Sequence, residues 1–170
     1  SLCYTSGTTG NPKGVLYSHR SILLHTFGML TFAADVGLTP SSTVLPVVPL
    51  FHANAWGLPF AVPLVGAKLV FPGAALDGAS LFSLMDRERV KAAWGVPTIW
   101  LGLLAEMRKQ KRKPQDFSFM LSGGSAVPRS MIQELEKEFG VDVTHGWGMT
   151  ECSPVGSTTT LGSQAKELSF

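Results

Sequence analysis

Residues 4–14 read YTSGTTGNPKG and place four hydroxyl side chains, three glycines and one lysine within eleven positions. No hydrophobic period runs through this segment, so its purpose is not packing. Glycines let backbone N–H groups point at a ligand, hydroxyl groups donate to oxyanions, and Lys13 adds a positive charge. A triphosphate requires these groups, and each hydrogen bond to a charged group contributes roughly 1.5–3 kcal/mol. The alternative is a mobile surface loop rich in glycine, serine and threonine.

Two common phosphate-binding patterns do not fit this segment. A Walker loop requires Gly-Lys followed by Ser or Thr, whereas Lys13 lies between Pro12 and Gly14. A dinucleotide-binding loop requires GxGxxG at the start of a helix, and the spacing of Gly7, Gly10 and Gly14 does not supply it. The sequence therefore argues against a Walker-type NTPase and against a Rossmann dehydrogenase.

Short apolar runs alternate along the chain with segments of helical period. SLCYT and GVLYS predict two strands joined by the loop at 4–14. Further strands are predicted at 43–50, 68–72, 92–97, 119–124 and 141–149, and helices at 55–66, 80–88 and 98–110. This order predicts an α/β fold with a mostly parallel sheet and helices on both of its faces.

Two further helices have recognisable starts. Ser18 is predicted to cap a helix that runs to about Val36, and Pro128 is predicted to lie in the first turn of a helix that Gly140 ends. The predicted inner face of the first comprises Leu23, Phe27, Leu30 and Ala34, and that of the second Ile132, Leu135 and Phe139.

Composition excludes several classes of protein. The net charge of +2 is too small to favour nucleic acid as a partner, and the basic run RKQKRK at 108–113 is interpreted as a solvated helix end. Charged residues make up 15% of the chain against a usual ~25%, which suggests that more protein covers part of this surface. Residues 36–67 carry no Asp, Glu, Lys or Arg, but the four prolines in the most apolar part of this segment, at 46, 49, 59 and 63, argue against a membrane span. Two cysteines outside any CxxC pattern fit a reducing compartment, hence the cytoplasm.

Four loops follow predicted strands and are rich in glycine or polar residues. They read TSGTTGNPKG, PLFHANAW, LSGGSAVP and HGWGMTE. Sheets of this class bind ligands at the carboxyl ends of their strands, so these loops are the candidate site.

The segments YTSGTTGNPKG and HGWGMTE, in this order and with LSGGSAVP between them, resemble the signatures of the adenylate-forming (AMP-binding) enzymes. That superfamily includes acyl-CoA synthetases, peptide-synthetase adenylation domains and beetle luciferases. The likeness extends over almost the whole chain, and PLFHANAWGLPF with GWGMTE is most similar to the branch of medium-chain fatty-acyl-CoA and methylthiopropionate-CoA ligases.

The resemblance implies a role for each loop. ATP would activate a carboxylic acid as an acyl-adenylate, and coenzyme A would then accept the acyl group. Lys13, Thr150 and Glu151 would be catalytic, with Glu151 holding Mg²⁺. The nucleotide would contact Thr5, Ser6, Gly7, Thr8, Thr9, Gly10, Lys13, Gly123, Gly124, Ser125, Gly146, Trp147, Gly148 and Thr150. Trp147 replaces the tyrosine that usually packs against adenine.

The acid is expected to be a plain carboxylic acid with an apolar tail. His52, Trp56, Ser122 and Gly123 would contact it, although His52 alone fits a core histidine equally well. Relatives that activate amino acids place an Asp in the segment around PLFHANAW to pair the ammonium group, and no Asp or Glu lies between residues 36 and 76.

By the same resemblance, residues 1–170 form part of an AMP-binding domain that is truncated at both ends and lacks the C-terminal domain. The remainder of the parent chain is then a partner, and the isolated 170 residues are expected to be inactive. Two alternatives stay open, namely a catalytically degenerate ATP- or AMP-binding module and an adenylation domain that loads a carrier protein.

Overall fold

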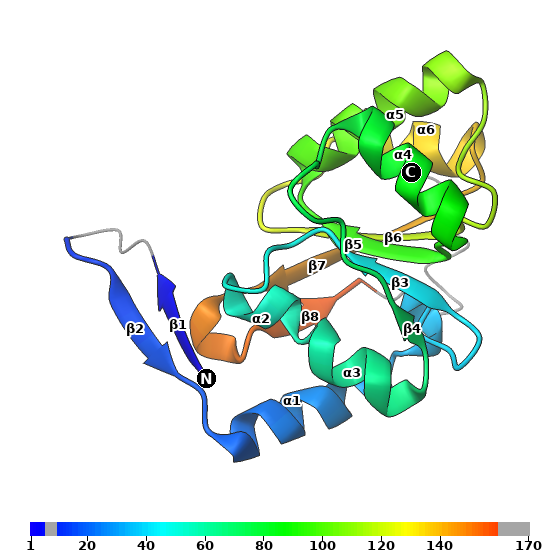
Figure 1. The fold of residues 1–170 in the computed structure, drawn as a ribbon. Coiled ribbons are helices and arrows are strands. Elements are labelled where there is room, and N and C mark those ends of the chain that lie inside the picture. The colour runs from blue at the N-terminus through cyan, green and yellow to red at the C-terminus, as the bar shows by residue number, and fades with distance from the viewer. Residues whose placement is uncertain (6–9, 160–170) are drawn as a thin grey trace.

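The computed structural model describes residues 1–5 and 10–159, which form two separate sheets (Figure 1). Strands β1 (Leu2–Thr5) and β2 (Lys13–Leu16) pair antiparallel as a two-stranded sheet of their own. The prediction that two strands flank the glycine-rich loop is therefore confirmed. The hairpin is not part of the parallel sheet, however, because β1 and β2 form a sheet of their own.

The main sheet has six strands. In spatial order they are β4 (Lys68–Leu69), β3 (Thr43–Pro46), β5 (Ala92–Gly95), β6 (Phe119–Gly123), β7 (Asp142–Gly148) and β8 (Val155–Thr158). The first five are parallel, and β8 runs antiparallel to β7. Strand β8 was not predicted from the sequence.

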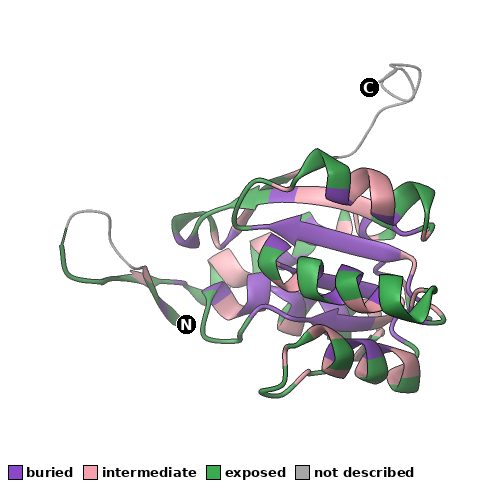
Figure 2. Cartoon of the chain, turned by 90° about the horizontal axis from the view of Figure 1, so that it is seen from above, coloured by how far each residue is buried: buried purple, intermediate pink, exposed green. Residues whose placement is uncertain are grey.

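Helices cover both faces of the sheet, as the sequence predicts (Figures 1 and 2). One face carries α4 (Gly78–Glu88), α5 (Pro97–Gln110) and α6 (Arg129–Lys137), and the other carries α1 (His19–Leu30), α2 (Ala53–Trp56) and α3 (Leu58–Val65). Two short 3-10 helices, η1 (Ala34–Val36) and η2 (Thr150–Cys152), complete the elements.

Alternate residues of each central strand enter opposite cores. In β3, Val44 faces the core under α1, α2 and α3, whereas Leu45 faces the core under α4, α5 and α6. Strand β6 repeats this pattern, with Leu121 on the first side and Met120 on the second. The alternation follows from the two-residue period of a strand, and the central strands of a sheet covered on both faces are therefore mostly apolar.

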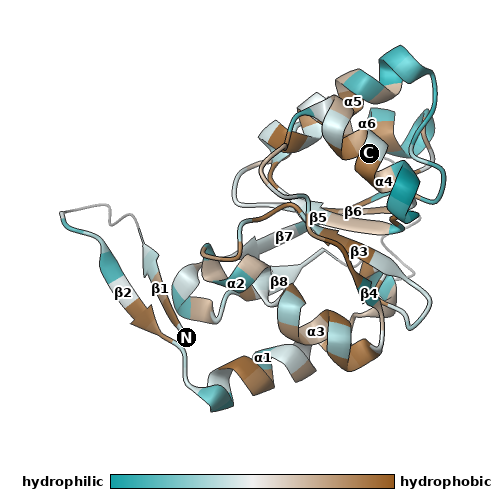
Figure 3. Cartoon of the chain, in the orientation of Figure 1, coloured by the Kyte–Doolittle hydropathy of each residue, from teal (hydrophilic) through white to brown (hydrophobic). Residues whose placement is uncertain are grey.

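The helix after Ser18 begins as predicted, but its end and its buried face differ. The Ser18 side chain accepts a hydrogen bond from the Ser21 N–H, as an N-cap should, and the helix ends at Leu30 rather than near Val36. Its buried residues are Thr26 and Met29, whereas Leu23 and Phe27 of the predicted face are 53% and 50% exposed. Helix α1 carries apolar residues on more than one side (Figure 3), so periodicity alone selected the wrong stripe.

The predicted inner face of α6 is partly correct. Leu135 is buried and Phe139 packs against the same core, but Met131 rather than Ile132 is the second buried residue. Pro128 is the residue before the helix and not part of its first turn.

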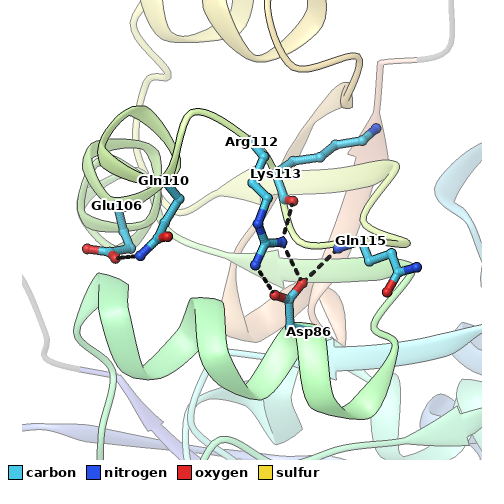
Figure 4. Close-up of polar contacts among 6 residues, drawn as sticks. All are labelled: Asp86, Glu106, Gln110, Arg112, Lys113 and Gln115. Atoms are coloured by element: carbon cyan, nitrogen blue, oxygen red, sulfur yellow. Dashed lines mark hydrogen bonds and ion pairs between the residues drawn. The ribbon is translucent and has the colours of Figure 1, made fainter.

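The basic run at 108–113 lies at the end of helix α5 and forms ion pairs with neighbouring helices, of which Figure 4 shows the pair of Arg112 with Asp86. The Arg112 guanidinium bonds both oxygens of Asp86 on α4, and Arg108 pairs with Glu134 on α6. The hydrogen bonds from Arg112 lower the pKa of the Asp86 carboxyl. The side chains of Arg108 and Arg112 are 57% and 51% exposed, as a solvated helix end should be. No helix within residues 1–5 and 10–159 has both the length and the hydropathy that a membrane span requires.

Candidate functional site

A pocket of about 470 Å³ lies at the carboxyl edge of the main sheet, where the hairpin approaches it. Its wall includes eleven of the residues that the sequence singled out. They are Thr5, Lys13, His52, Trp56, Gly123, Gly124, Gly146, Trp147, Gly148, Thr150 and Glu151. These residues come from three of the predicted loops after sheet strands and from the separate hairpin, so segments up to about 145 positions apart meet at one place.

The hairpin contributes Thr5 and Lys13. The two residues are directly opposite each other in the antiparallel pair, so the loop between them begins and ends at the pocket. Gly10 has a φ of +142° that favours glycine, is exposed, and does not line the pocket. The predicted ligands Ser6, Gly7, Thr8 and Thr9 lie outside the described residues.

The end of β7 and the 3-10 helix after it supply the largest share of the wall. Trp147 is exposed at the pocket, Thr150 is nearly buried, and Glu151 is exposed. Strand β8 holds this segment in place, because Trp147 pairs with Ser157 and the Met149 N–H donates to the Pro154 carbonyl at 3.0 Å.

The residues of LSGGSAVP, at the end of β6, lie partly on the pocket wall and partly away from it. Gly123 and Gly124 line the pocket, whereas Ser122 is fully buried, Ser125 is exposed, and neither serine is part of the pocket wall. A Cβ on Gly123 would lie 2.7 Å from the Gly146 carbonyl oxygen, and Gly124 has a φ of +79°. Close strand packing and a tight turn therefore account for both glycines without a ligand.

Residues of PLFHANAW form an unusual wall. The φ angles of Ala53, Asn54, Ala55 and Trp56 lie between +47° and +57°, so α2 is one turn of left-handed helix. Such a turn costs roughly 1–2 kcal/mol per non-glycine residue. Contacts hold it: the Asn54 amide oxygen accepts hydrogen bonds from the Ser1 hydroxyl at 3.0 Å and from the Cys3 thiol at 3.7 Å. The turn places Ala53 and Trp56 on the pocket wall, and strain of this kind gathers at functional sites.

His52 precedes this turn and is exposed at the pocket, so it is not a core histidine. The wall is otherwise apolar around it, with the indole of Trp56 and the side chains of Leu121 and Val155. Among the described residues of the wall, Lys13 carries the fixed positive charge and Glu151 the carboxylate.

A partly buried histidine of α1 contacts the wall at Val155. The Val155 N–H donates to Nε2 of His25 at 3.1 Å, which requires that this nitrogen be unprotonated. Burial lowers the pKa of His25, in agreement with a neutral ring. Sequence reasoning gave His25 no role, because a single histidine on a helix carries no spacing signal.

Sequence reasoning also missed five residues of the wall. They are Ala53, Leu121, Met149, Pro154 and Val155. Ala53, Leu121 and Met149 are direct neighbours in sequence of predicted site residues, which is the signal that could have found them. Pro154 and Val155 reach the pocket because β8 folds back on β7, and no motif marks that reversal.

The comparisons with known proteins agree with this geometry. The model of the AMP-binding enzyme family matches residues 1–169. A medium-chain fatty acid–CoA ligase of Ectopseudomonas oleovorans is 56% identical over 94% of this chain, and a 3-methylmercaptopropionyl-CoA ligase of Ruegeria pomeroyi is 53% identical over 93% of it. The structure of o-succinylbenzoate-CoA synthetase from Bacillus subtilis in complex with ATP and magnesium superposes with a TM-score of 0.79, at 29% identity and over 94% of this chain.

The fold is thus an α/β fold with a mostly parallel sheet covered by helices on both faces, and the chain belongs to the AMP-binding enzyme family. It spans 29% of the length of each of the two ligases and 32% of the synthetase.

Proposed function

We propose that this chain is the nucleotide-binding core of an AMP-forming acid–thiol ligase, which activates a carboxylic acid with ATP and transfers the acyl group to coenzyme A. One observation carries the proposal: a single pocket joins the Lys13 hairpin, the hydroxyl and carboxylate of Thr150 and Glu151, and an apolar wall. The activity is proposed for a parent enzyme of the length of the relatives, and not for the 170 residues alone. In that parent the chain would be the inner part of the larger domain.

In the proposed reaction, a carboxylate oxygen attacks the α-phosphorus of ATP, and the bond to pyrophosphate breaks. Lys13 and Thr5, with the loop between them, would hold the β- and γ-phosphates and the departing pyrophosphate. Thr150 would donate to the α-phosphate. Fixed donors of this kind act on charge that develops in the transition state, where they contribute most to the rate. The thiol of coenzyme A then attacks the acyl carbonyl and AMP leaves.

Glu151 is the residue proposed to hold Mg²⁺. Magnesium in phosphate-transfer sites takes one or two protein carboxylates and completes its octahedron with phosphate oxygens and water. An exposed carboxylate on the wall next to Thr150 fits this requirement. When bound, the ion would neutralise charge on the phosphates. The ring of Trp147 would pack against adenine, and Gly123, Gly124, Gly146 and Gly148 line the same pocket.

The substrate is proposed to be a carboxylic acid with an apolar tail, and a fatty acid is the first candidate. Ala53, Trp56 and Leu121 line the pocket, and no Asp or Glu lies between residues 36 and 76. A substrate ammonium group would therefore lack a partner at this wall. The names of the two ligases, which act on a medium-chain fatty acid and on 3-methylmercaptopropionate, support the same class of acid.

The test is ATP–pyrophosphate exchange by the full-length parent enzyme with a series of acids from about C3 to C16. Lys13→Ala should lower kcat/KM for ATP by about 10- to 150-fold, because it removes a charged contact of roughly 1.5–3 kcal/mol. Lys137→Ala, at the exposed end of α6, is the matched control. Exchange that is unaffected by Lys13→Ala would refute the role of the hairpin.

Two other outcomes would redirect the proposal. ATP binding without any exchange would identify a catalytically degenerate nucleotide-binding module. Exchange without acyl transfer to coenzyme A, but with transfer to a phosphopantetheine carrier, would identify an adenylation domain that loads a carrier protein.

A further inference from the structure

The hairpin that carries Lys13 stands away from the main sheet, so the contacts that fasten it determine where its loop lies (Figure 1). One of these contacts reaches the opposite wall of the pocket. Tyr17 follows β2 directly, and its hydroxyl donates a hydrogen bond to the carbonyl oxygen of Thr150, 133 positions further along the chain. The backbone of Tyr17 is fixed as well, because its N–H donates to the Ser1 carbonyl at 2.7 Å.

Tyr17 is 4% exposed, and its hydroxyl donates its hydrogen bond to the carbonyl oxygen of Thr150 in the pocket wall. Burial raises the pKa of Tyr17 to about 12, with smaller contributions from Cys3 and Glu151. The phenol therefore stays protonated and remains a donor throughout the physiological range of pH.

Within the described part of the chain, the other hydrogen bonds of residues 149–153 stay within residues 149–154. The Cys152 N–H donates to the Met149 carbonyl at 2.8 Å, and the Met149 N–H donates to Pro154 at 3.0 Å. Bonds of this range define the shape of the turn but do not relate it to the hairpin. Tyr17 does relate the two, since it belongs to the hairpin and bonds the main chain of Thr150 itself.

We propose that Tyr17 is a positioning residue that couples the phosphate-binding hairpin to the Thr150–Glu151 segment. The inference rests on the proposed function, because it assumes that the loop between β1 and β2 binds the polyphosphate. Through this bond, a ligand held by the hairpin also positions the turn that would contact the α-phosphate and Mg²⁺. A tyrosine that only filled space would need its ring and not its hydroxyl.

The experiment measures amide hydrogen exchange by mass spectrometry on the full-length parent enzyme, with and without magnesium pyrophosphate. Pyrophosphate is the part of ATP that the loop is proposed to hold, so it probes the loop. Because its Mg²⁺ would also contact Glu151, protection of residues 149–153 is assigned to Tyr17 only where Tyr17→Phe removes it. In the wild type we expect protection of residues 4–14 and also of residues 149–153. Tyr17→Phe, which keeps the buried ring, should retain the first protection and lose the second. Tyr4→Phe is the matched control, since Tyr4 is 63% exposed on the same hairpin.

The rate of adenylate formation gives a second readout. Tyr17→Phe should lower kcat about tenfold, the order expected for one lost hydrogen bond, and leave KM for ATP within about twofold. A role in packing alone would lower the melting temperature without this division between kcat and KM.

The outcomes separate the two proposals. If pyrophosphate protects neither segment in the wild type, the proposed function fails. If it protects residues 4–14 but not 149–153, the function stands and the coupling is refuted, and this result needs no variant. Protection of both segments that survives Tyr17→Phe also overturns the role of the hydroxyl.

Discussion

Gly148→Ala is expected to damage the site through a clash within the chain itself. A Cβ at this position would lie 2.3 Å from the carbonyl oxygen of Pro154, whereas real Cβ contacts essentially never fall below 3.0 Å. Strands β7 and β8 must therefore separate by at least the difference of about 0.7 Å. The same oxygen accepts the hydrogen bond from Met149, so the displacement passes directly to the segment that carries Thr150.

The size of the effect follows from this displacement. Overpacking of a tight contact typically costs about 1–3 kcal/mol of folding free energy. The cost applies in full here because the neighbouring atom belongs to the backbone and cannot rotate away. A catalytic group moved by about 1 Å can lose roughly 100-fold in rate. We therefore expect Gly148→Ala to lower both the free energy of unfolding and, by about 10- to 100-fold, the rate of pyrophosphate exchange.

Two measurements on the full-length enzyme distinguish two reasons why glycine is required at position 148. One is urea unfolding in the absence of ligand, and the other is the rate of pyrophosphate exchange. If the glycine is required by the strand contact, stability falls even in the absence of nucleotide. If it is required only for the approach of a ligand, activity falls and stability does not. Gly28→Ala in α1 is the control, since a Cβ there meets no atom within 4 Å and should stabilise the helix by about 0.5–1 kcal/mol. Wild-type stability of Gly148→Ala would refute the reasoning.

Three further predictions concern stability. In urea unfolding, Gly78→Ala and Gly102→Ala should change the free energy of unfolding in opposite directions. A Cβ on Gly78 would lie 2.1 Å from the Gly102 carbonyl oxygen and should destabilise the protein by about 1–3 kcal/mol. A Cβ on Gly102 approaches no atom closer than 3.7 Å and should stabilise helix α5 by about 0.5–1 kcal/mol. Arg112 lowers the pKa of Asp86, so their ion pair should contribute about 0.5–1 kcal/mol to the free energy of unfolding at pH values above the unfolded pKa near 4. This contribution should be lost as the pH falls through the lower pKa of the folded state. Asp86→Asn should remove that part of the dependence of stability on acid pH. Burial lowers the pKa of His25, so the folded state binds this proton less readily than the unfolded state. The free energy of unfolding should therefore fall as the pH drops below the unfolded pKa of about 6.5. In thermal melts from pH 8 to pH 5, the melting temperature should fall less for His25→Gln than for the wild type.

Much of the fold could be read from the sequence because each central strand is buried on both faces. Such strands are short, continuously apolar runs, and the helices between them carry a clear start such as Ser18. The residues of the pocket were likewise recognisable where glycine, hydroxyl and charged residues cluster directly after a strand. Eleven of them do meet at one wall, and their roles toward a ligand stay predictions.

The remaining features depend on contacts between distant segments, which local patterns do not encode. The wrong face of α1 is one case: Leu23 and Met29 are equally apolar, and only the packing of α1 decides that Met29 is buried. The left-handed turn at Ala53–Trp56 is another, since nothing in the propensities of alanine or tryptophan favours a positive φ. Strand β8 was missed because a four-residue antiparallel edge strand of small and polar residues has almost no apolar signal.

The hairpin and its flanking residues contact both the strained wall and the segment at Thr150, which line the same pocket. Its first strand and the residue before it hold the left-handed turn through Asn54, and Tyr17 at its other end holds the turn at Thr150. The apolar wall and the wall with the carboxylate are therefore tied to the same two-stranded element, although they belong to different parts of the main sheet. An acid and a nucleotide bound at these walls would meet at a distance set by the hairpin, because any displacement of the hairpin displaces both of its anchors. The contacts that position the site thus lie in the first 17 residues as much as in the sheet.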